Sequence, residues 1–246
     1  MVNFTDYFKV AKDYIDSAYV TQRKNIIDAS MLACECMEKN GIIQLVGLNH
    51  GCEFAMELGY RAGGLMPFHQ FNLRDLALRG HIDKDTLNNP EIINDEGLAK
   101  KWMDIYNIEK SDMYLFSSDD GCEALLTELA RIVKSDHRKV IVVIPLQKVI
   151  NSESKHSLGY KITDFADVII DLGVDGDTTV LSIGDVEINQ VSTIVGNVIA
   201  QMMTAEMYRY FKEHNKECPV LLSANVKGAD VHNRALAEKY LGRWNS

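Results

Sequence analysis

A short polar loop with two adjacent carboxylates is the part of this sequence whose residue types point most directly to chemistry. Residues 118–122 read Ser-Asp-Asp-Gly-Cys, between the apolar run 113–116 and an amphipathic segment. In α/β proteins, a loop between a strand and a helix commonly binds phosphate through main-chain N–H groups. Here a carboxylate stands where a phosphate-binding hydroxyl is expected, so the loop has the position of an anion site but the wrong charge.

Three further residues have side chains that could move a proton. His50 lies in the loop 47–51, Glu57 follows it on a predicted helix, and His232 lies near the C-terminus. Histidine exchanges protons near neutral pH, and a carboxylate can act as a general base. Each also has a structural alternative, as a salt-bridged helix glutamate or a hydrogen-bonded histidine. We expect a structural role for His156.

Ser192 and Thr193 open a long apolar segment, 192–214, which is predicted to be a buried or dimer-facing helix. The N–H groups at such a helix start can bind an anion. The alternative is a simple N-cap, which Ser and Thr supply at many helices.

The elements that must position these residues alternate between strand and helix. Two helices are predicted within 4–39, as an N-terminal helical extension covering residues 1–40. Segment 68–96 carries Asn88-Asn89-Pro90 and is predicted to be an irregular excursion, either a lid or a surface loop that precedes a helix near 95–106. The remaining pattern predicts strands at 42–46, 113–117, 139–144 and 167–171, with helices at 50–61, 121–134 and 230–240.

This alternation predicts an α/β fold with a parallel sheet and right-handed crossovers. In such a sheet, ligands bind at the carboxyl ends of the strands, near the point where strand order reverses. The loops 47–51 and 117–121 both follow predicted strands, so both are expected at this edge.

Composition narrows the class of protein. The chain has 246 residues and 46% hydrophobic content, which predicts one large domain spanning residues 1–246. A net charge of −9 and a pI near 5.3 argue against a nucleic-acid partner. No apolar run approaches the roughly 20 residues of a membrane span, and the first ten residues lack a signal-peptide pattern. We therefore expect a cytoplasmic protein without a membrane partner.

Several common sites are disfavoured. The dinucleotide pattern Gly-x-Gly-x-x-Gly is broken by Asn49, and no Gly-Lys-Ser/Thr of a P-loop is present. Cys34 and Cys36 stand two positions apart, about 200° around a helix, so they are predicted to be buried apolar residues. The five cysteines show no disulfide spacing, and we expect no metal site.

Six segments of the chain, taken together, carry a resemblance to a known family. They are Gly47-x-x-His50, Glu57-x-x-Tyr60-Arg61-Ala62-Gly63-Gly64-Leu65, 112–121, Ser154-x-His156-Ser157-x-Gly159, Ser192-Thr193-Ile194-x-Gly196, and Ser223-Ala224-Asn225-Val226-x-Gly228-x-Asp230-x-His232-Asn233. Over nearly the whole chain, the sequence resembles the sugar isomerase (SIS) domain superfamily, and within it the bacterial phosphosugar-binding SIS proteins. The resemblance implies a three-layer αβα sandwich with a five-stranded parallel sheet in flavodoxin-like order, additional N-terminal helices, and a homodimer with sites near the subunit interface.

The resemblance also implies a function. Members bind phosphorylated sugars, and enzymatic relatives interconvert aldoses and ketoses or act on amino sugars, without a redox cofactor or metal. Glu57 matches the carboxylate base of related isomerases and is expected to face the pocket. His50 matches the family's loop histidine, and His232 is expected to reach the pocket from the C-terminal segment. Either histidine could shuttle protons. The implied substrate-binding residues are Asn49, Gly51, Ser118, Asp119, Asp120, Gly121, Ser192 and Thr193.

The chain departs from the family in both phosphate loops. Where members read Gly-Thr-Gly-His-Ser, this chain has Leu48, Asn49 and Gly51 at the second, third and fifth positions. Where they read Ser-Asn-Ser-Gly, residues 118–121 are Ser-Asp-Asp-Gly. A carboxylate ~4 Å from a phosphate charge costs roughly 4 kcal/mol per unit pair at an effective dielectric of about 20. The pair Asp120-x-x-Glu123 is also typical of a helix-capping box, in which Asp120 would occupy the amides that phosphate needs.

Three functional hypotheses follow. The first is a carbohydrate-derivative binder or an isomerase with an altered substrate, such as an amino sugar or a non-phosphorylated polyol. The second is a noncatalytic metabolite sensor or a subunit of an assembly. The third is a sugar-phosphate isomerase that binds phosphate elsewhere, through Ser118, Ser192, Thr193 and either Arg61 or lysine residues of the partner subunit. The two altered loops predict that phosphate binding at residues 118–122 is weakened or absent.

Overall fold

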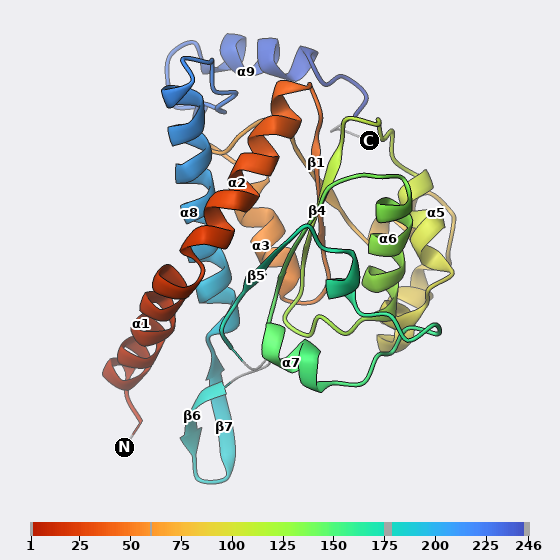
Figure 1. Cartoon of the computed structure of the whole chain (residues 1–246), viewed down its shortest axis with the longest axis vertical. Helices are drawn as coiled ribbons and strands as arrows, with labels where there is room; N and C mark the ends of the chain where they lie inside the picture. Colours follow the sequence, from red (N-terminus) through yellow and green to blue (C-terminus); the bar gives the residue numbers. More distant parts are fainter. Residues whose placement is uncertain (1, 60, 175–178, 244–246) are drawn as a thin grey trace.

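A five-stranded parallel sheet forms the centre of the computed structural model (Figure 1), which describes residues 2–59, 61–174 and 179–243. The strand order β2-β1-β3-β4-β5 confirms the expected flavodoxin-like order. Tyr60, quoted above in one family segment, lies outside the described residues. The strands are β1 (Ile43–Gly47), β2 (Phe68–Phe71), β3 (Met113–Ser117), β4 (Val140–Ile144) and β5 (Val168–Asp171).

The central strands are apolar because both of their faces are covered. β1, β3 and β4 are buried at every position, as expected for the middle of a parallel sheet. In β1, Ile43 aligns with Phe68 of β2 on one side and with Met113 of β3 on the other. The carboxyl ends of β1 and β3 therefore lie side by side, as the sequence predicted.

The prediction that segment 68–96 is irregular is wrong for its first four residues, which form strand β2. This strand reads Phe-His-Gln-Phe. Its two polar residues mean that it lacks the continuous apolar run by which the other strands were predicted. The buried ring of His69 is satisfied by Gln44 of β1, with 2.7 Å between Nδ1 and Oε1. The rest of the segment holds short helices, namely α4 (Arg74–Leu78), η1 (Lys84–Asn88) and η2 (Pro90–Asn94).

Helices cover both faces of the sheet and make the expected three layers (Figure 1). One apolar core joins the sheet to the first helices and the longest one, and a second core lies on the opposite face. The first layer contains α1 (Phe4–Thr21), α2 (Arg23–Glu38), α3 (Gly51–Leu58) and α8 (Ser192–Glu213). The second contains α5 (Leu98–Asp104), α6 (Ala124–Ser135), α7 (Leu146–Asn151) and η3 (Ile162–Phe165).

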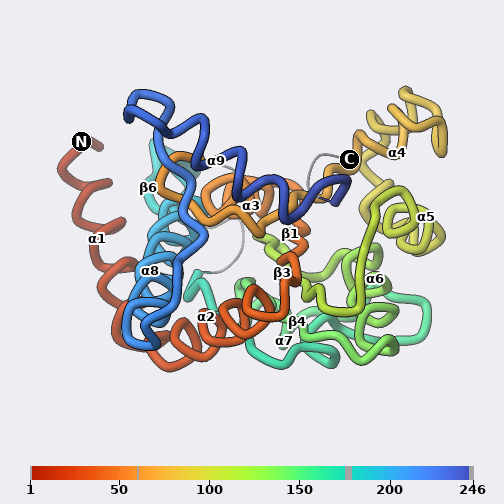
Figure 2. The backbone as a smooth tube through the Cα atoms, turned by 90° about the horizontal axis from the view of Figure 1, so that it is seen from above, coloured from red at the N-terminus to blue at the C-terminus, as the bar shows by residue number. Residues whose placement is uncertain are grey.

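The two predicted N-terminal helices are confirmed. Asn3 caps α1, since its side chain accepts from the main-chain N–H of Thr5 and Asp6 while the Asp6 carboxylate accepts from Asn3. Both helices pack on α8, and Figure 2 shows α1 reaching beyond the rest of the first layer.

A C-terminal helix, α9 (Ala229–Glu238), lies across the amino edge of the sheet (Figure 1). Its residues pack with Ile42 and Met66, which immediately precede β1 and the turn into β2. Beyond α9, Arg243 is buried against Asp112 at the start of β3. The end of the described chain is therefore fixed to the first residues of the sheet.

A two-stranded antiparallel hairpin, β6 (Thr179–Ile183) and β7 (Val186–Gln190), projects from the layers just before α8 (Figure 1). No element was predicted there. In the part of the chain that the structure describes, no helix is both long and apolar enough to cross a membrane.

Candidate functional site

A pocket opens where strand order reverses, between the carboxyl ends of β1 and β3. β1 lies between β2 and β3 in the sheet, and the chain continues from β1 toward β2 but from β3 toward β4. The loops after β1 and β3 therefore lead away from each other at this point. Including its open mouth, the pocket encloses about 280 Å³. It is lined by His50, Gly51, Phe54, Ser117, Ser118, Asp119, Val143, Leu172, Ser192, Thr193 and Gly196.

Close packing of the two loops forms the pocket wall. Ser117 at the end of β3 donates to the carbonyl oxygen of Gly51, at 2.6 Å between the oxygens. A Cβ added at Gly51 would collide with the carbonyl oxygen of Ser117. Glycine at 51 therefore lets α3 begin against the end of β3, and the hydroxyl that family members carry there has no room in this arrangement.

Ser118 organises the loop that follows β3. Its Oγ accepts from the main-chain N–H of Asp120 at 2.9 Å and of Gly121 at 2.8 Å, and it donates to Oε1 of Glu123 at 2.5 Å. These two amides are the groups that a phosphate at this loop would use. The Ser118 hydroxyl takes the place of that anion.

Glu123 is a buried carboxyl that the sequence analysis assigned only to a cap. Its side chain is fully buried, and burial raises its pKa to about 7 although the hydrogen bond from Ser118 opposes the shift. Among the described residues, its second oxygen, Oε2, has no hydrogen-bond partner. The pocket wall thus has a titratable group directly behind the Ser118 hydroxyl.

The prediction that Asp120 and Glu123 form a capping box is wrong, because α6 begins at Ala124 instead of Gly121. The N-cap position falls on Glu123, whose side chain makes no capping bond. The cause is local: Gly121 has φ +70°, a left-handed conformation that helix residues do not adopt. Asp120 therefore cannot cap α6.

Asp120 instead forms ion pairs with two lysines. Its carboxylate lies 2.6 Å from Nζ of Lys148 on α7 and 3.0 Å from Nζ of Lys155 in the following loop. Burial alone would raise the pKa of Asp120, but the hydrogen bonds and charges of the two lysines outweigh it and lower the pKa. The negative charge predicted for this loop is present and is matched by cations that the sequence analysis did not identify.

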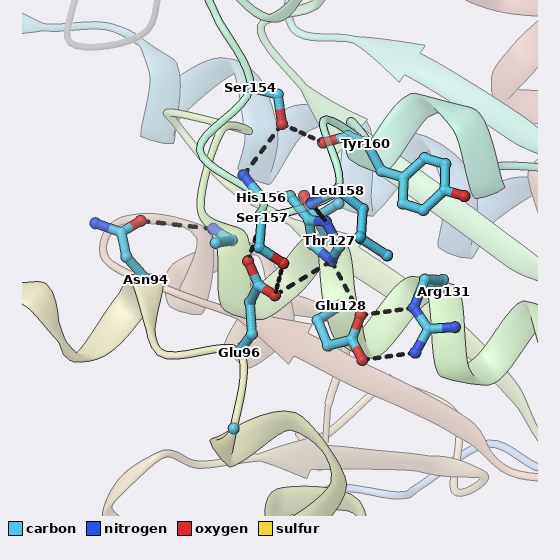
Figure 3. A network of polar contacts seen from close by, with 12 residues as sticks. Asn94, Glu96, Thr127, Glu128, Arg131, Ser154, His156, Ser157, Leu158 and Tyr160 are labelled. Carbon is cyan, nitrogen blue, oxygen red and sulfur yellow. Dashed lines mark hydrogen bonds and ion pairs between the residues drawn. The ribbon is translucent and has the colours of Figure 1, made fainter.

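The loop that carries Lys155 is fixed by the polar network in Figure 3. His156 is buried, and its Nε2 lies 3.0 Å from Oε2 of Glu128 on α6. Its Nδ1 accepts from the main-chain N–H of Leu158, and Ser157 donates through both its N–H and its hydroxyl to Glu96. His156 therefore joins three segments of the second layer, which agrees with the structural role expected for it.

The charge of the pocket lining is unusual for an anion site. Asp119 is buried in the wall, and His50, whose side chain is about half exposed, lies at the mouth. No lysine or arginine is among those lining residues that belong to the described ranges. The hydroxyl of Ser192 is buried at the start of α8 and, within the described residues, has no hydrogen-bond partner. The N-cap alternative for Ser192 is therefore wrong, since its side chain makes no cap bond.

The structure gathers six of the eleven predicted site residues in this pocket. The six are His50, Gly51, Ser118, Asp119, Ser192 and Thr193. Asn49 is exposed with φ 51° in the turn before α3, and Asp120 and Gly121 lie on the far side of the Ser118 loop. The other two, Glu57 and His232, are separated from the pocket within one chain.

Glu57 faces away from the pocket. Its carboxylate accepts from Nε2 of Gln201 on α8 at 2.5 Å and pairs with Arg61. It borders an open apolar groove between α3 and α8, whose other lining residues are Ile194, Asn197, Val198, Gln201, Met202 and Ala205. Within one chain, the expected orientation of Glu57 toward the pocket is not observed.

His232 lies at the opposite edge of the sheet. Its Nε2 is 2.9 Å from the carbonyl oxygen of Val220, and the adjacent Asn233 bonds both main-chain groups of Leu222. Val220 pairs with Leu65, which precedes β2 at the amino edge. Within one chain, His232 therefore holds the segment 220–222 in place.

Among the described residues, no group of three His, Cys, Asp or Glu side chains is arranged to hold a metal ion. The pocket offers hydroxyls, one carboxylate and one imidazole. These groups can bind sugar hydroxyls, or an ammonium group, by hydrogen bonds.

Comparisons with known proteins agree with this fold. A model described as an SIS domain matches residues 6–144. UPF0309 proteins from Geobacillus sp. (strain WCH70) and Listeria monocytogenes serotype 4b (strain CLIP80459) are 32% and 31% identical. The two alignments cover 96% and 98% of this chain, and 95% and 96% of the Geobacillus and Listeria proteins, respectively. The chain belongs to the SIS domain family.

The solved structures similar to this SIS protein agree on its fold. A phosphoheptose isomerase from Francisella tularensis has a TM-score of 0.56 at 12% identity, covering 83% of this chain and 96% of that one. The phosphoheptose isomerase GmhA from Neisseria gonorrhoeae gives 0.53 at 14% identity, covering 82% and 95%. The predicted three-layer SIS fold is confirmed, and these structural neighbours carry the names of phosphosugar isomerases.

Proposed function

We propose that this SIS protein is a cytoplasmic homodimer that binds a carbohydrate derivative with no phosphate group, such as a polyol or an amino sugar, in the pocket at the carboxyl edge. One observation carries the proposal. The pocket has the SIS position and hydroxyls at Ser118, Ser192 and Thr193, but among the described lining residues the charged or titratable side chains are one buried carboxylate, Asp119, and one histidine, His50.

The charge argument disfavours a phosphate in this pocket. A phosphate group would meet the Asp119 carboxylate in the pocket wall, where the described lining residues include no lysine or arginine, and Ser118 already occupies two loop amides. An amino sugar would instead place its ammonium group near a carboxylate. The overall net charge of −9 further supports a small-molecule ligand over a nucleic acid.

A calorimetric panel tests the proposal. Wild-type protein is titrated with glucose, sorbitol, glucosamine and glucose 6-phosphate. We expect at least one unphosphorylated ligand to bind about tenfold or more tightly than glucose 6-phosphate. For glucosamine, Asp119→Asn should weaken binding about tenfold, since the ammonium loses its counter-charge, while glucose is unaffected.

Asp185→Asn, in the exposed turn of the β6–β7 hairpin, is the matched control for removing one carboxylate. Preferential binding of glucose 6-phosphate by the wild type would overturn the proposal. So would the absence of binding by every compound in a panel extended to the commonly occurring sugars and polyols.

An isomerase built across the dimer is the second candidate, and the position of Glu57 favours it. The groove that Glu57 borders is lined by the apolar residues Ile194, Val198, Met202 and Ala205 on the outer face of α8. A second subunit on this face would bury that apolar area and would bring Glu57 close to the partner. The base absent from the pocket of one chain would then come from the dimer.

Glu57→Gln separates binding from catalysis. If the dimer is an isomerase, the variant should retain ligand affinity and lose about 10²-fold or more of the turnover, as removal of a general base does. Glu206→Gln on the exposed side of α8 is the control. Equal turnover in wild type and Glu57→Gln would contradict this role, and binding without turnover in either would leave the noncatalytic sensor as the better description.

A further inference from the structure

The two lysines around Asp120 form a cationic site whose anion is supplied by the protein itself. Lys148 extends from α7 and Lys155 from the loop that follows it, and the two Nζ atoms reach different oxygens of the same carboxylate. The Asp120 side chain is 21% exposed, so the pair of lysines largely encloses it. A bound anion such as phosphate would be held in the same way, by two cations that contact different oxygens.

The elements that carry these lysines are held in position independently of Asp120. The loop of Lys155 is anchored through His156 to Glu128 and through Ser157 to Glu96 (Figure 3). The end of α7 is fixed by Lys161, whose Nζ donates to the carbonyl oxygens of Val149 and Ile150 at 2.8 and 2.9 Å. Removing the Asp120 charge would therefore leave both elements in place.

The cationic site is adjacent in the chain to the ligand pocket. Ser118 and Asp119 line the pocket, and Asp120 is the next residue. The N–H of Asp120 is bonded to Ser118, so the main chain at this position is fixed by a bond that the Asp120 side chain does not make. A substitution that keeps the shape of residue 120 and removes only its charge should leave the loop intact.

We propose that Lys148 and Lys155 constitute an anion subsite, that Asp120 occupies it, and that Asp120 excludes phosphorylated ligands from this subsite. The ligand class of the subsite is a phosphate or phosphomonoester. In wild type the cluster of three side chains carries a net charge of +1, and without the Asp120 carboxylate it carries +2. The inference goes beyond the proposed function, because the subsite lies on the far side of the Ser118 loop from the ligand pocket.

Asp120→Asn is the direct test, with inorganic phosphate and glucose 6-phosphate as probes in calorimetry at low ionic strength. We expect the variant to bind inorganic phosphate at least about tenfold more tightly than wild type. The two lysines lose the Asp120 carboxylate and can bind the free phosphate in its place. In the Asp120→Asn background, Lys148→Met with Lys155→Met should remove the gain. Asp120→Ser, with circular dichroism of each variant, covers the case in which the asparagine disturbs folding.

Asp167→Asn is a matched control, because Asp167 also lies between two lysines. Its carboxylate is 2.6 Å from Lys134 Nζ and 3.0 Å from Lys139 Nζ, at the amino edge of the sheet. An equal gain of phosphate binding in Asp167→Asn, or no gain in folded Asp120→Asn and Asp120→Ser, would overturn the anion subsite. Failure of wild type to bind any sugar, together with a gain in Asp120→Asn, would instead overturn the proposed function and keep the subsite.

Discussion

Replacement of Arg243 by alanine should lower the free energy of unfolding by about 3–5 kcal/mol, the usual cost of removing one member of a buried ion pair. Asp112 is fully buried, and its carboxylate pairs with Arg243 while accepting from the main-chain N–H of Ile42 at 2.8 Å and from Nε2 of Gln44 at 3.0 Å. Without the guanidinium, a buried negative charge remains at the start of β1 and β3. The amino ends of both strands, whose carboxyl ends carry the pocket loops, depend on this network.

Urea unfolding followed by circular dichroism measures the loss. Arg209→Ala is the matched control, since Arg209 pairs with Glu206 and Glu213 on the exposed face of α8 and its removal should change stability little. A second variant, Arg243→Ala with Asp112→Asn, should recover part of the loss, because the charge left behind is removed. Equal stability of Arg243→Ala and wild type would show that this end of the chain does not fix the sheet.

Most of the fold was predictable because the sequence repeats one physical signal. Runs such as Val-Ile-Val-Val-Ile in β4 occur where a parallel strand is covered on both faces, and the helices between them show apolar spacing of three and four. β2 was missed because His69 and Gln70 interrupt its four residues, and the Gln44 bond that satisfies His69 comes from 25 positions away. A local pattern does not contain that partner.

The site residues that directly follow a strand could be predicted from the sequence. His50, Gly51, Ser118 and Asp119 were found because each follows β1 or β3, and Ser192 because it begins a long helix. The direction of a helix side chain is not fixed in the same way. Glu57 was expected to face the pocket, but α8 packs on α3 and Gln201 binds its carboxylate on the other side.

The partners of the acidic loop could not be predicted from spacing. Lys148 and Lys155 are 28 and 35 positions from Asp120, and neither belongs to a motif that implies an anion site. The available signal was the resemblance of residues 154–159 to a family segment, which marks this loop as part of the site region. The ion pairs with Lys148 and Lys155 explain why the loop tolerates Asp120.

Glu123→Gln should change how stability depends on pH, because the buried Glu123 carboxyl keeps its proton in the folded protein up to about pH 7. Its ordinary pKa is 4.5, so between pH 4.5 and 7 the unfolded chain releases this proton and the folded chain retains it. The stability that Glu123 contributes is thus fully present below pH 4.5 and is lost as pH rises to 7. The loss is about 2–4 kcal/mol, at 1.36 kcal/mol per pKa unit.

The decisive quantity is the unfolding free energy of Glu123→Gln minus that of wild type, measured by urea unfolding at intervals from pH 4 to pH 8. It should increase by about 2–4 kcal/mol between pH 4.5 and 7 and stay constant above, since glutamine has no proton to lose. Glu128→Gln gives the opposite sign, because Arg131 and His156 lower the pKa of Glu128 and its contribution is lost as pH falls. A difference for Glu123→Gln that is flat with pH would mean that Glu123 is ionised behind Ser118. The Ser118 hydroxyl would then face a full negative charge at neutral pH, and the pocket wall would carry this charge in addition to that of Asp119.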